Sequence, residues 1–283
     1  METILKLESD IEIMRKRIAD YKKLNVEYHG FLKSLRCAYI PSDDLPPKII
    51  WTCWLQGVEK MPPLVKTCHR ALAEKFADWT HILITQDNLE QYITLDKIFT
   101  RKWRKGIISS TAFSNMIRLD LLENYGGIWI DATVLVTGEK FPEYVTRTPF
   151  FMYSSWHWLS GDVRPISTWF IASCKNHPLL KLVKSLLEKY WLDKDYLQTY
   201  FIFHMFFRMV ITEYPQIFES VPKVSNVLPH FMQFELQTKY CAKRFAELKT
   251  LSPIHKLTYK LPEKVLVSRD TLYAHLINGG SEL

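Results

Sequence analysis

The feature that most constrains the fold is an alternation of short apolar segments with helical ones. Residues 48–54 and 79–85 are apolar runs of strand length. A helix opened by Pro62-Pro63 follows the first, and a helix capped by Gln86-Asp87-Asn88 follows the second. Such alternation predicts a parallel sheet with right-handed crossovers. The predicted fold class is therefore α/β, with a mostly parallel sheet flanked by helices.

The stretch from residue 114 to 137 presents a single carboxylate after a buried strand. Apolar residues recur at helical spacing, and Gly126-Gly127 ends that helix because glycine tolerates a left-handed backbone. The strand Ile128–Ile130 follows and leads directly to Asp131. An unpaired carboxylate is costly to bury, so we expect Asp131 to be exposed at the sheet edge beside a cation or a ligand hydroxyl.

Other residues lie at comparable strand ends. Ligands of open α/β sheets bind beyond the carboxyl ends of the strands. Trp54, Asn88 and Asp131 all follow predicted strands, which predicts one shared pocket. From Val221 onward the pattern is irregular and basic, and Asn278-Gly-Gly indicates a turn.

Charge and cysteine content limit the compartment and the partners. The five cysteines are odd in number and include no CxxC pair, which favours reduced thiols in a cytosolic compartment. The charged N-terminus is not a signal peptide, and no apolar run reaches membrane-spanning length. A net charge of +7 favours an anionic partner, such as a nucleotide or a membrane surface. The basic cluster Arg101–Lys105 is either a solvated helix end or a contact for anionic lipid, and no nucleic-acid motif accompanies it.

The first 36 residues differ from the rest, and we assign residues 1–40 to an N-terminal helical extension of the domain 41–283. Two interpretations remain open. In the first, an amphipathic helix, or a pair of helices meeting near Gly30, packs on the chain's own domain. In the second, residues 1–36 form a parallel homodimer. Apolar residues and one asparagine, Asn25, recur there at heptad-type spacing. They are Ile4, Leu7, Ile11, Met14, Ile18, Tyr21, Asn25, Tyr28, Leu32 and Leu35.

Several motifs in a fixed order give the chain a recognisable pattern. They are Pro47–Trp54, Asp87-Asn88, Ser114–Arg118 with Gly126–Thr133, and Trp169–Ser173 followed by Asn176-His-Pro178. Together they resemble the capsular polysaccharide synthesis proteins related to glycosyltransferase family 32, whose nucleotide-sugar fold is called GT-A. The resemblance covers roughly residues 46 to 180 and implies a GT-A-like domain with a Rossmann-like nucleotide-binding half.

The same resemblance implies an activity and a location. It implies a retaining hexosyltransferase that uses a nucleotide sugar, most often a UDP-hexose, and an acceptor saccharide on a lipid carrier. The enzyme would be cytoplasmic and peripheral at the inner face of the bacterial cell membrane. Two alternatives remain: a catalytically degenerate scaffold in a polysaccharide assembly complex, and a glycosyltransferase that modifies a protein.

The resemblance also implies roles for individual residues. Trp54 matches a tryptophan that stacks on the nucleotide base, which an aromatic face suits. Arg118 matches an arginine that reaches the sugar or diphosphate oxygens, and Asp131 matches the first carboxylate of the DXD motif. These last two are the implied catalytic residues. The implied donor-binding residues are Cys53, Trp54, Asn88, Ser114, Asn115, Arg118, Trp129 and Asp131.

Two positions depart from the wider family. Asn115 and Thr133 stand where it has aspartates. Asn115 makes an acidic contact to the donor sugar neutral, and Thr133 removes one anionic ligand from the implied site for Mn²⁺ or Mg²⁺. The predicted metal ligands are Asp131, Thr133 through its hydroxyl or a water, and His275 near the C-terminus. A relaxed metal requirement is the alternative, since affinity for divalent ions falls as ligand charge is lost.

Aromatic segments are candidates for the acceptor side. Trp156, His157 and Trp158, together with the segment Tyr200–Phe207, either form a platform for a sugar or belong to an aromatic core. His204, within the apolar helix predicted over residues 200–211, is expected to be a core histidine.

Overall fold

A five-stranded sheet with the order β2-β1-β3-β6-β5 forms the centre of the structure. The structure is a computed structural model that describes residues 2–37, 43–155 and 163–279. β1 pairs in parallel with β2 and β3, whereas β6 runs antiparallel to β3 and β5. Four of the five strands therefore point in one direction, and the predicted α/β class with a mostly parallel sheet is confirmed. The strands are β1 (Ile49–Cys53), β2 (Thr80–Ile84), β3 (Gly127–Ile130), β5 (Phe150–Ser154) and β6 (Ile166–Ser173).

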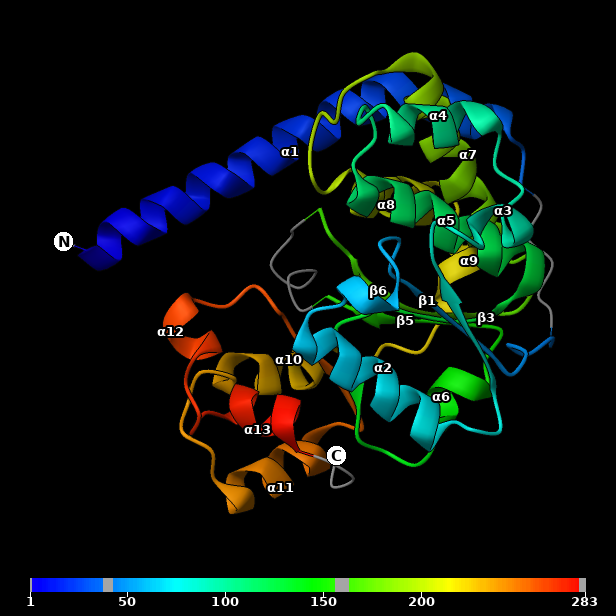
Figure 1. Ribbon diagram of the computed structural model, residues 1–283. Coiled ribbons are helices and arrows are strands. Elements are labelled where there is room, and N and C mark those ends of the chain that lie inside the picture. The colour runs from blue at the N-terminus through cyan, green and yellow to red at the C-terminus, as the bar shows by residue number, and fades with distance from the viewer. Residues whose placement is uncertain (1, 38–42, 156–162, 280–283) are drawn as a thin grey trace.

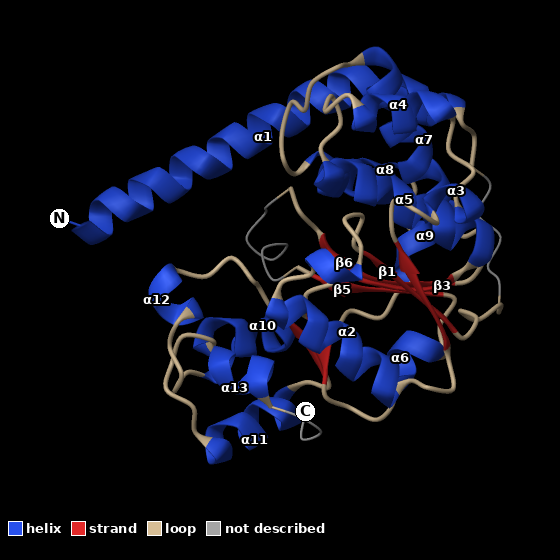
Figure 2. Cartoon of the chain, in the orientation of Figure 1, coloured by secondary structure: helices blue, strands red, loops and turns tan. Residues whose placement is uncertain are grey.

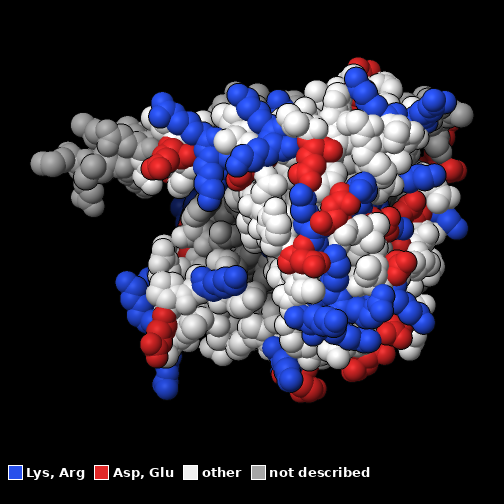
Figure 3. Space-filling model, turned by 90° about the horizontal axis from the view of Figure 1, so that it is seen from above, with Lys and Arg blue, Asp and Glu red and all other residues white. Residues whose placement is uncertain are grey.

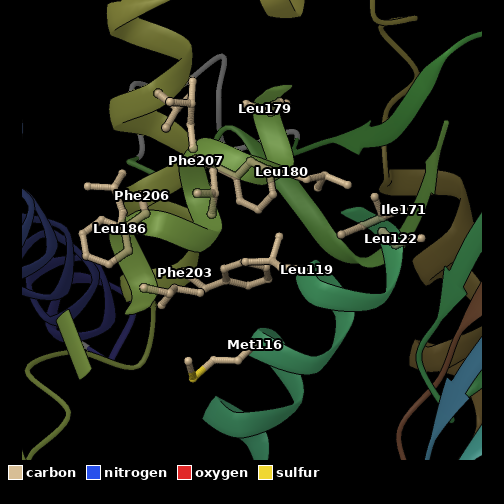
Figure 4. Packing of buried hydrophobic residues seen from close by; sticks show 14 of the residues in the cluster. Met116, Leu119, Leu122, Ile171, Leu179, Leu180, Leu186, Phe203, Phe206 and Phe207 are labelled. Atoms are coloured by element: carbon tan, nitrogen blue, oxygen red, sulfur yellow. The ribbon is translucent and has the colours of Figure 1, made fainter. Parts of the chain in front are cut away.

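Helices cover both faces of this sheet (Figure 1; Figure 2). One face carries α5 (Ser110–Tyr125), α7 (Pro178–Asp193) and α8 (Ile202–Glu213), and the other carries α2 (Pro63–Lys75) and α6 (Glu143–Thr146). On the first face, Met116 and Leu119 of α5 meet Phe203 of α8 in a continuous apolar core (Figure 4). The short elements are η1 (Val58–Lys60), α3 (Leu89–Tyr92), α4 (Lys97–Arg104) and α9 (Gln216–Glu219).

The C-terminal part of the chain forms a separate cluster of helices beside the sheet (Figure 1). It comprises α10 (Val227–Glu235), α11 (Ala242–Leu251), α12 (Glu263–Leu266) and α13 (Leu272–Asn278), whose apolar core also includes residues of α2 and β4. Between α11 and α12, β7 (Ile254–Lys256) pairs antiparallel with β4 (Val134–Val136), the strand that follows Asp131. The sequence pattern after Val221 is irregular because these helices are short and carry too few turns to show a clear period.

The N-terminal extension is one helix, α1 (Glu2–Ser34), which continues through Gly30. Leu24, Tyr28 and Leu32 on its second half are buried against α7 and α8, which confirms packing on the chain's own domain for this half. The first half extends away from the body (Figure 1), and Ile11, Met14 and Ile18 are exposed on it. A homodimer through residues 1–36 stays a prediction, and the predicted boundary at residue 40 lies outside the described residues.

The predicted glycine turn is confirmed between α5 and β3. Gly126 and Gly127 have φ angles of 70° and 100°, in the region that favours glycine. A Cβ on Gly127 would lie 2.5 Å from the carbonyl oxygen of Ile49 on β1. The turn therefore brings β3 directly against β1 and aims Asp131 at the carboxyl end of the sheet.

The helix α5 buries charge as well as apolar surface. Asp120 is fully buried and accepts hydrogen bonds from the backbone and hydroxyl of Thr94, at 2.6 and 2.8 Å. Lys184 of α7 lies 2.6 Å from the same carboxylate and 2.9 Å from Glu123. This polar network ties α5 to α7 behind the sheet.

The basic cluster on α4 is largely used within the protein. Lys102 donates to the carbonyl oxygens of Trp191 and Lys194, and the Trp103 ring stacks on Phe113 with centroids 4.9 Å apart. Arg104 pairs with a glutamate of α3. Seen from above, Lys and Arg are spread over this face with Asp and Glu between them (Figure 3). Among the described helices, none is long and apolar enough to cross a membrane.

Candidate active site

A cavity of about 440 Å³ lies beyond the carboxyl ends of β1 and β3. Its walls come from the ends of these strands, from the first turns of α5 and from residues 256–260 after β7. Trp54 and Asp131 share this cavity, as predicted from their positions after strands. The polar and aromatic side chains that line it are Cys53, Trp54, Gln56, Ser110, Thr111, Ser114, Arg118, Trp129, Asp131, Thr133, Tyr200, Gln233, Lys256, Thr258, Tyr259 and Lys260.

Asp131 is held on both of its oxygens. Its Oδ1 accepts from the indole nitrogen of Trp129 at 2.9 Å and lies 3.2 Å from Arg118. Its Oδ2 lies 3.4 Å from the Nζ of Lys256. Burial raises the pKa of the Asp131 carboxyl, but the charges of Arg118 and Lys256, with hydrogen bonds from Trp129 and Lys256, outweigh it and lower the pKa below the ordinary value. Asp131 is therefore ionised at neutral pH and already has partners, with 26% of its side chain exposed.

Arg118 is the fixed centre of the cavity floor, because its side chain is only 5% exposed. It donates to the backbone oxygens of Thr168 and Ser114. Its guanidinium also lies over the ring of Trp129, 4.7 Å from the centroid. Burial lowers the pKa of Arg118 and the Asp131 charge opposes that shift. The helix α5 and the strands β3 and β6 together hold this cation at one orientation.

Part of the cavity wall is aromatic. The rings of Trp54 and Tyr259 meet edge to face at 5.7 Å. Trp54 immediately follows β1, and its backbone nitrogen donates to Ile84 on β2, so the sheet edge fixes its position. Beside it, burial raises the pKa of the Cys53 thiol to about 12, which leaves a neutral thiol that packs rather than reacts. This wall suits a flat ring such as a nucleotide base.

Two of the predicted donor-binding residues do not line the cavity. The side-chain oxygen of Asn88 accepts from Thr85, and its amide nitrogen donates to Leu83, so both ends serve the turn after β2. Asn115 is half-buried on α5, outside the cavity lining. Ser114 does line the cavity, one turn before Arg118, and its hydroxyl donates to Thr111.

Of the three predicted metal ligands, Asp131 and Thr133 lie together in this cavity and His275 does not. His275 lies on α13, where its ring stacks on Tyr240 with centroids 3.7 Å apart, and it lines a different cavity. The Thr133 hydroxyl accepts a hydrogen bond from Lys256 at 2.5 Å. A lysine therefore lies against both Asp131 and Thr133, where a divalent ion would have to bind. Among the described residues, no group of three histidines, cysteines or carboxylates is placed to hold a metal. The residues present do not fit a divalent ion.

The wall formed by residues 256–260 was not predicted from the sequence. Lys256 is 125 residues from Asp131 along the chain and is brought to it only by the pairing of β7 with β4. Tyr259 and Lys260 follow in the same segment. A strand of three residues gives almost no periodic signal, so only the apolar, basic Ile254-His-Lys-Leu pattern could have drawn attention to it.

A second cavity, of about 630 Å³, lies on the other side of Trp169 and α10. The backbone oxygen of Trp169 accepts from the backbone nitrogen of Asp131 at 2.9 Å, so the two cavities share a wall. Gln233 on α10 faces the first cavity, whereas His230 and Phe234 line the second. The polar and aromatic side chains of the second cavity are Ser155, Arg164, Ser167, Trp169, His204, Asn226, His230, Phe231 and Phe234.

The predicted aromatic platform divides between core and cavity. Phe203, Phe206 and Phe207 are fully buried in the core, which confirms the core interpretation for these rings. Tyr200 is 67% exposed and lines the first cavity. His204 is half-buried, lines the second cavity and lies 3.4 Å from the hydroxyl of Thr168. Trp156, His157 and Trp158 lie outside the described residues.

Fold and cavity together define a class: an α/β protein whose ligand site combines an aromatic wall with buried cations at the carboxyl ends of parallel strands. The chain belongs to the family of capsular polysaccharide synthesis proteins, whose family model matches residues 6–276. The resemblance inferred from the motifs is therefore confirmed and extends over nearly the whole chain.

Individual relatives are glycosyltransferases. The chain is 26% identical over 160 residues to the O-glycosyltransferase braB of Annulohypoxylon truncatum. That alignment covers 51% of this chain but only 38% of the relative. Among solved structures, the chain is similar to the PaToxG glycosyltransferase, with a TM-score of 0.46 and 12% identity over 93% of this chain and 95% of that one. It is also similar to a glycosyltransferase involved in glycosylation of the major capsid of PBCV-1, with a TM-score of 0.38 and 14% identity over 74% of this chain and 93% of that one.

Proposed function

We propose that the chain is a glycosyltransferase that takes a hexose from a nucleoside diphosphate sugar of the UDP-hexose type. The observation that carries the proposal is the cavity that joins an aromatic wall at Trp54 to the cations Arg118 and Lys256. A nucleotide sugar has the matching parts in the same order: a flat base, a doubly charged diphosphate and a sugar. The base stacks on Trp54 and Tyr259, and the diphosphate lies towards the cations.

The proposed transfer retains the configuration of the sugar. The bond between the sugar C1 and the diphosphate oxygen breaks, with its electron pair going to that oxygen. The acceptor hydroxyl oxygen bonds to C1 on the same face, and its proton passes to the departing phosphate oxygen. Asp131 is the only carboxylate among the described residues that line the cavity. Its pKa is lowered and its oxygens have partners, so it is poorly suited to act as base or nucleophile. Its role is to position Arg118 and the donor.

We propose that the acceptor is a saccharide and that it occupies the second cavity. Phe231 and Phe234 offer exposed aromatic surface there, and the shared wall at Trp169 sets this cavity next to Asp131. Sugar C–H faces pack on such rings. Family membership supports an acceptor in polysaccharide synthesis, carried on a lipid at the inner face of the cell membrane.

Calorimetry with a panel of nucleoside diphosphates tests the donor proposal. Wild type should bind at least one of them, and Trp54→Ala should weaken binding about tenfold or more because base stacking contributes roughly 1–3 kcal/mol. Trp79→Ala is the matched control, because Trp79 packs on Phe76 and Phe141 away from the cavity. If no nucleotide binds wild type, the enzyme proposal fails and the scaffold alternative gains support.

Product analysis tests the reaction and the acceptor. Proton NMR of the first-formed product should show the anomeric configuration of the donor, whereas inversion would contradict the proposed mechanism. Phe234→Ala should raise the KM for a saccharide acceptor and leave nucleotide affinity unchanged. Val267→Ala is a control, since Val267 is as exposed as Phe234 (70% against 69%) but lies on another surface. Flotation with anionic lipid vesicles tests membrane association, and recovery of all the protein in the unbound fraction would contradict it.

A further inference from the structure

The cation beside Asp131 belongs to the chain itself. β7 pairs with β4 so that Lys256 lies opposite Val134, and its Nζ reaches back to Thr133 at 2.5 Å and Asp131 at 3.4 Å. The Lys256 side chain is 20% exposed and lines the cavity. It is thus anchored on one side by a hydroxyl and a carboxylate, and it faces the space where the diphosphate is proposed to bind.

The local charge disfavours a divalent ion at this position. One carboxylate, Asp131, is shared by two cations, Arg118 and Lys256, so the three side chains carry a net charge of +1. Mg²⁺ and Mn²⁺ need anionic or neutral oxygens with free lone pairs. The oxygens of Asp131 and Thr133 instead face donors, and an incoming divalent ion would be repelled by both cations. A diphosphate, in contrast, is attracted to the same arrangement.

We propose that Lys256 supplies the positive charge that a divalent metal would otherwise provide, so that donor binding and sugar transfer are independent of metal. This inference rests on the proposed function, because it assigns the diphosphate end of the donor to Lys256. The ammonium donates hydrogen bonds to the diphosphate and stabilises the negative charge that collects on its oxygen as the bond to C1 breaks. Lys256 is then a catalytic residue in direct contact with substrate.

Thr133, at the position of the second DXD aspartate, is consistent with Lys256 in place of a metal. An aspartate at residue 133 would attract a metal, whereas Thr133 offers one neutral oxygen that accepts from Lys256. The hydroxyl fixes the lysine without neutralising it, so its charge remains available to the ligand. The threonine in place of a second aspartate and the lysine beside it therefore serve the same purpose, which is to keep a positive charge next to Asp131.

Calorimetry with the best-bound nucleoside diphosphate, in EDTA and in Mn²⁺, tests the inference. The wild-type affinity should agree within about twofold between the two buffers. Lys256→Gln should lose about 10- to 100-fold in both, because a hydrogen bond to a charged group contributes roughly 1.5–3 kcal/mol. Lys264→Gln, an exposed lysine on α12, should bind like wild type. Circular dichroism melting curves check that each variant is folded.

A converse variant separates the inference from a general loss of charge. Lys256→Asp places a second carboxylate beside Asp131 and Thr133, so its nucleotide binding should be weak in EDTA and recover in Mn²⁺ by about tenfold or more. Titration with Mn²⁺ alone should give binding for this variant and none for wild type. If wild type binds nucleotide only in Mn²⁺, or if Lys256→Gln binds normally, the inference is wrong and the proposed function stands. If wild type binds no nucleotide in either buffer, both fail.

Discussion

Replacement of Asp131 by asparagine tests the electrostatic centre of the site. Coulomb's law with an effective dielectric constant of about 20 gives roughly 5 kcal/mol of attraction for a pair at the observed 3.2 Å from Arg118. The net loss is smaller, because desolvation cancels much of that attraction and asparagine still accepts hydrogen bonds. Removal of one partner of a buried pair costs about 3–5 kcal/mol. We expect about 3 kcal/mol for Asp131→Asn, since a quarter of the Asp131 side chain is exposed.

Urea denaturation at neutral pH measures this loss, with Asp10→Asn on the exposed half of α1 as the control. Lys256→Gln should cost less than about 1 kcal/mol, because it leaves Asp131 paired with Arg118. The lowered pKa of Asp131 means that folding favours its ionised form. Its contribution is complete above the ordinary value of 3.8 and is lost as the pH falls through the lower folded-state pKa. A free energy of unfolding for Asp131→Asn within about 0.5 kcal/mol of wild type would refute the coupling.

Three further predictions concern stability, each measured as a free energy of unfolding in urea. Gly127→Ala should cost at least about 2 kcal/mol, because its φ of 100° disfavours any side chain. Gly30→Ala should stabilise by up to about 1 kcal/mol, because Gly30 lies in a helix with open space around it. Equal effects of the two substitutions would contradict this. Asp120→Ala should cost about 1–3 kcal/mol, since it leaves the backbone nitrogen and hydroxyl of Thr94 without their acceptor while Lys184 keeps Glu123, and a neutral result would exclude that network. Tyr28→Ala should cost about 3–5 kcal/mol and Ile11→Ala under 0.5, because only Tyr28 is buried; similar losses would place both halves of α1 in the core.

The sequence predicted those parts of the fold where local and global signals agree. The strand–helix alternation up to residue 131 and the glycine turn at Gly126-Gly127 are both confirmed. In α5, however, the helical period marked Asp120 as one of the polar positions, and the structure buries it. Periodicity assigns polar residues to solvent, and it cannot reveal that Lys184, 64 residues away, makes burial tolerable.

The part of the site at the strand ends was predicted from the sequence, whereas the part contributed by Lys256 was not. Trp54 and Asp131 follow strands whose ends meet at the same sheet edge, so topology alone brings them together, whereas Arg118 on α5 was expected there only from the family resemblance. Asn88 occupies an equivalent position, but both ends of its amide side chain are hydrogen-bonded within the turn after β2. Lys256 reaches the site only because β7 pairs with β4. It lies 123 residues after Thr133 in the sequence, and a single sequence carries no local signal for such a pairing.

The pairing of β4 with β7 also fixes the order in which the site becomes complete as the chain is made. All five strands of the central sheet lie before residue 174, as do Arg118 and Asp131. Ribosomal synthesis adds roughly 5–20 residues per second, so several seconds separate the emergence of Asp131 from that of Lys256. A nascent chain therefore carries the aspartate and the arginine without the lysine, and the contact of Lys256 with Asp131 and Thr133 is the last of these to form.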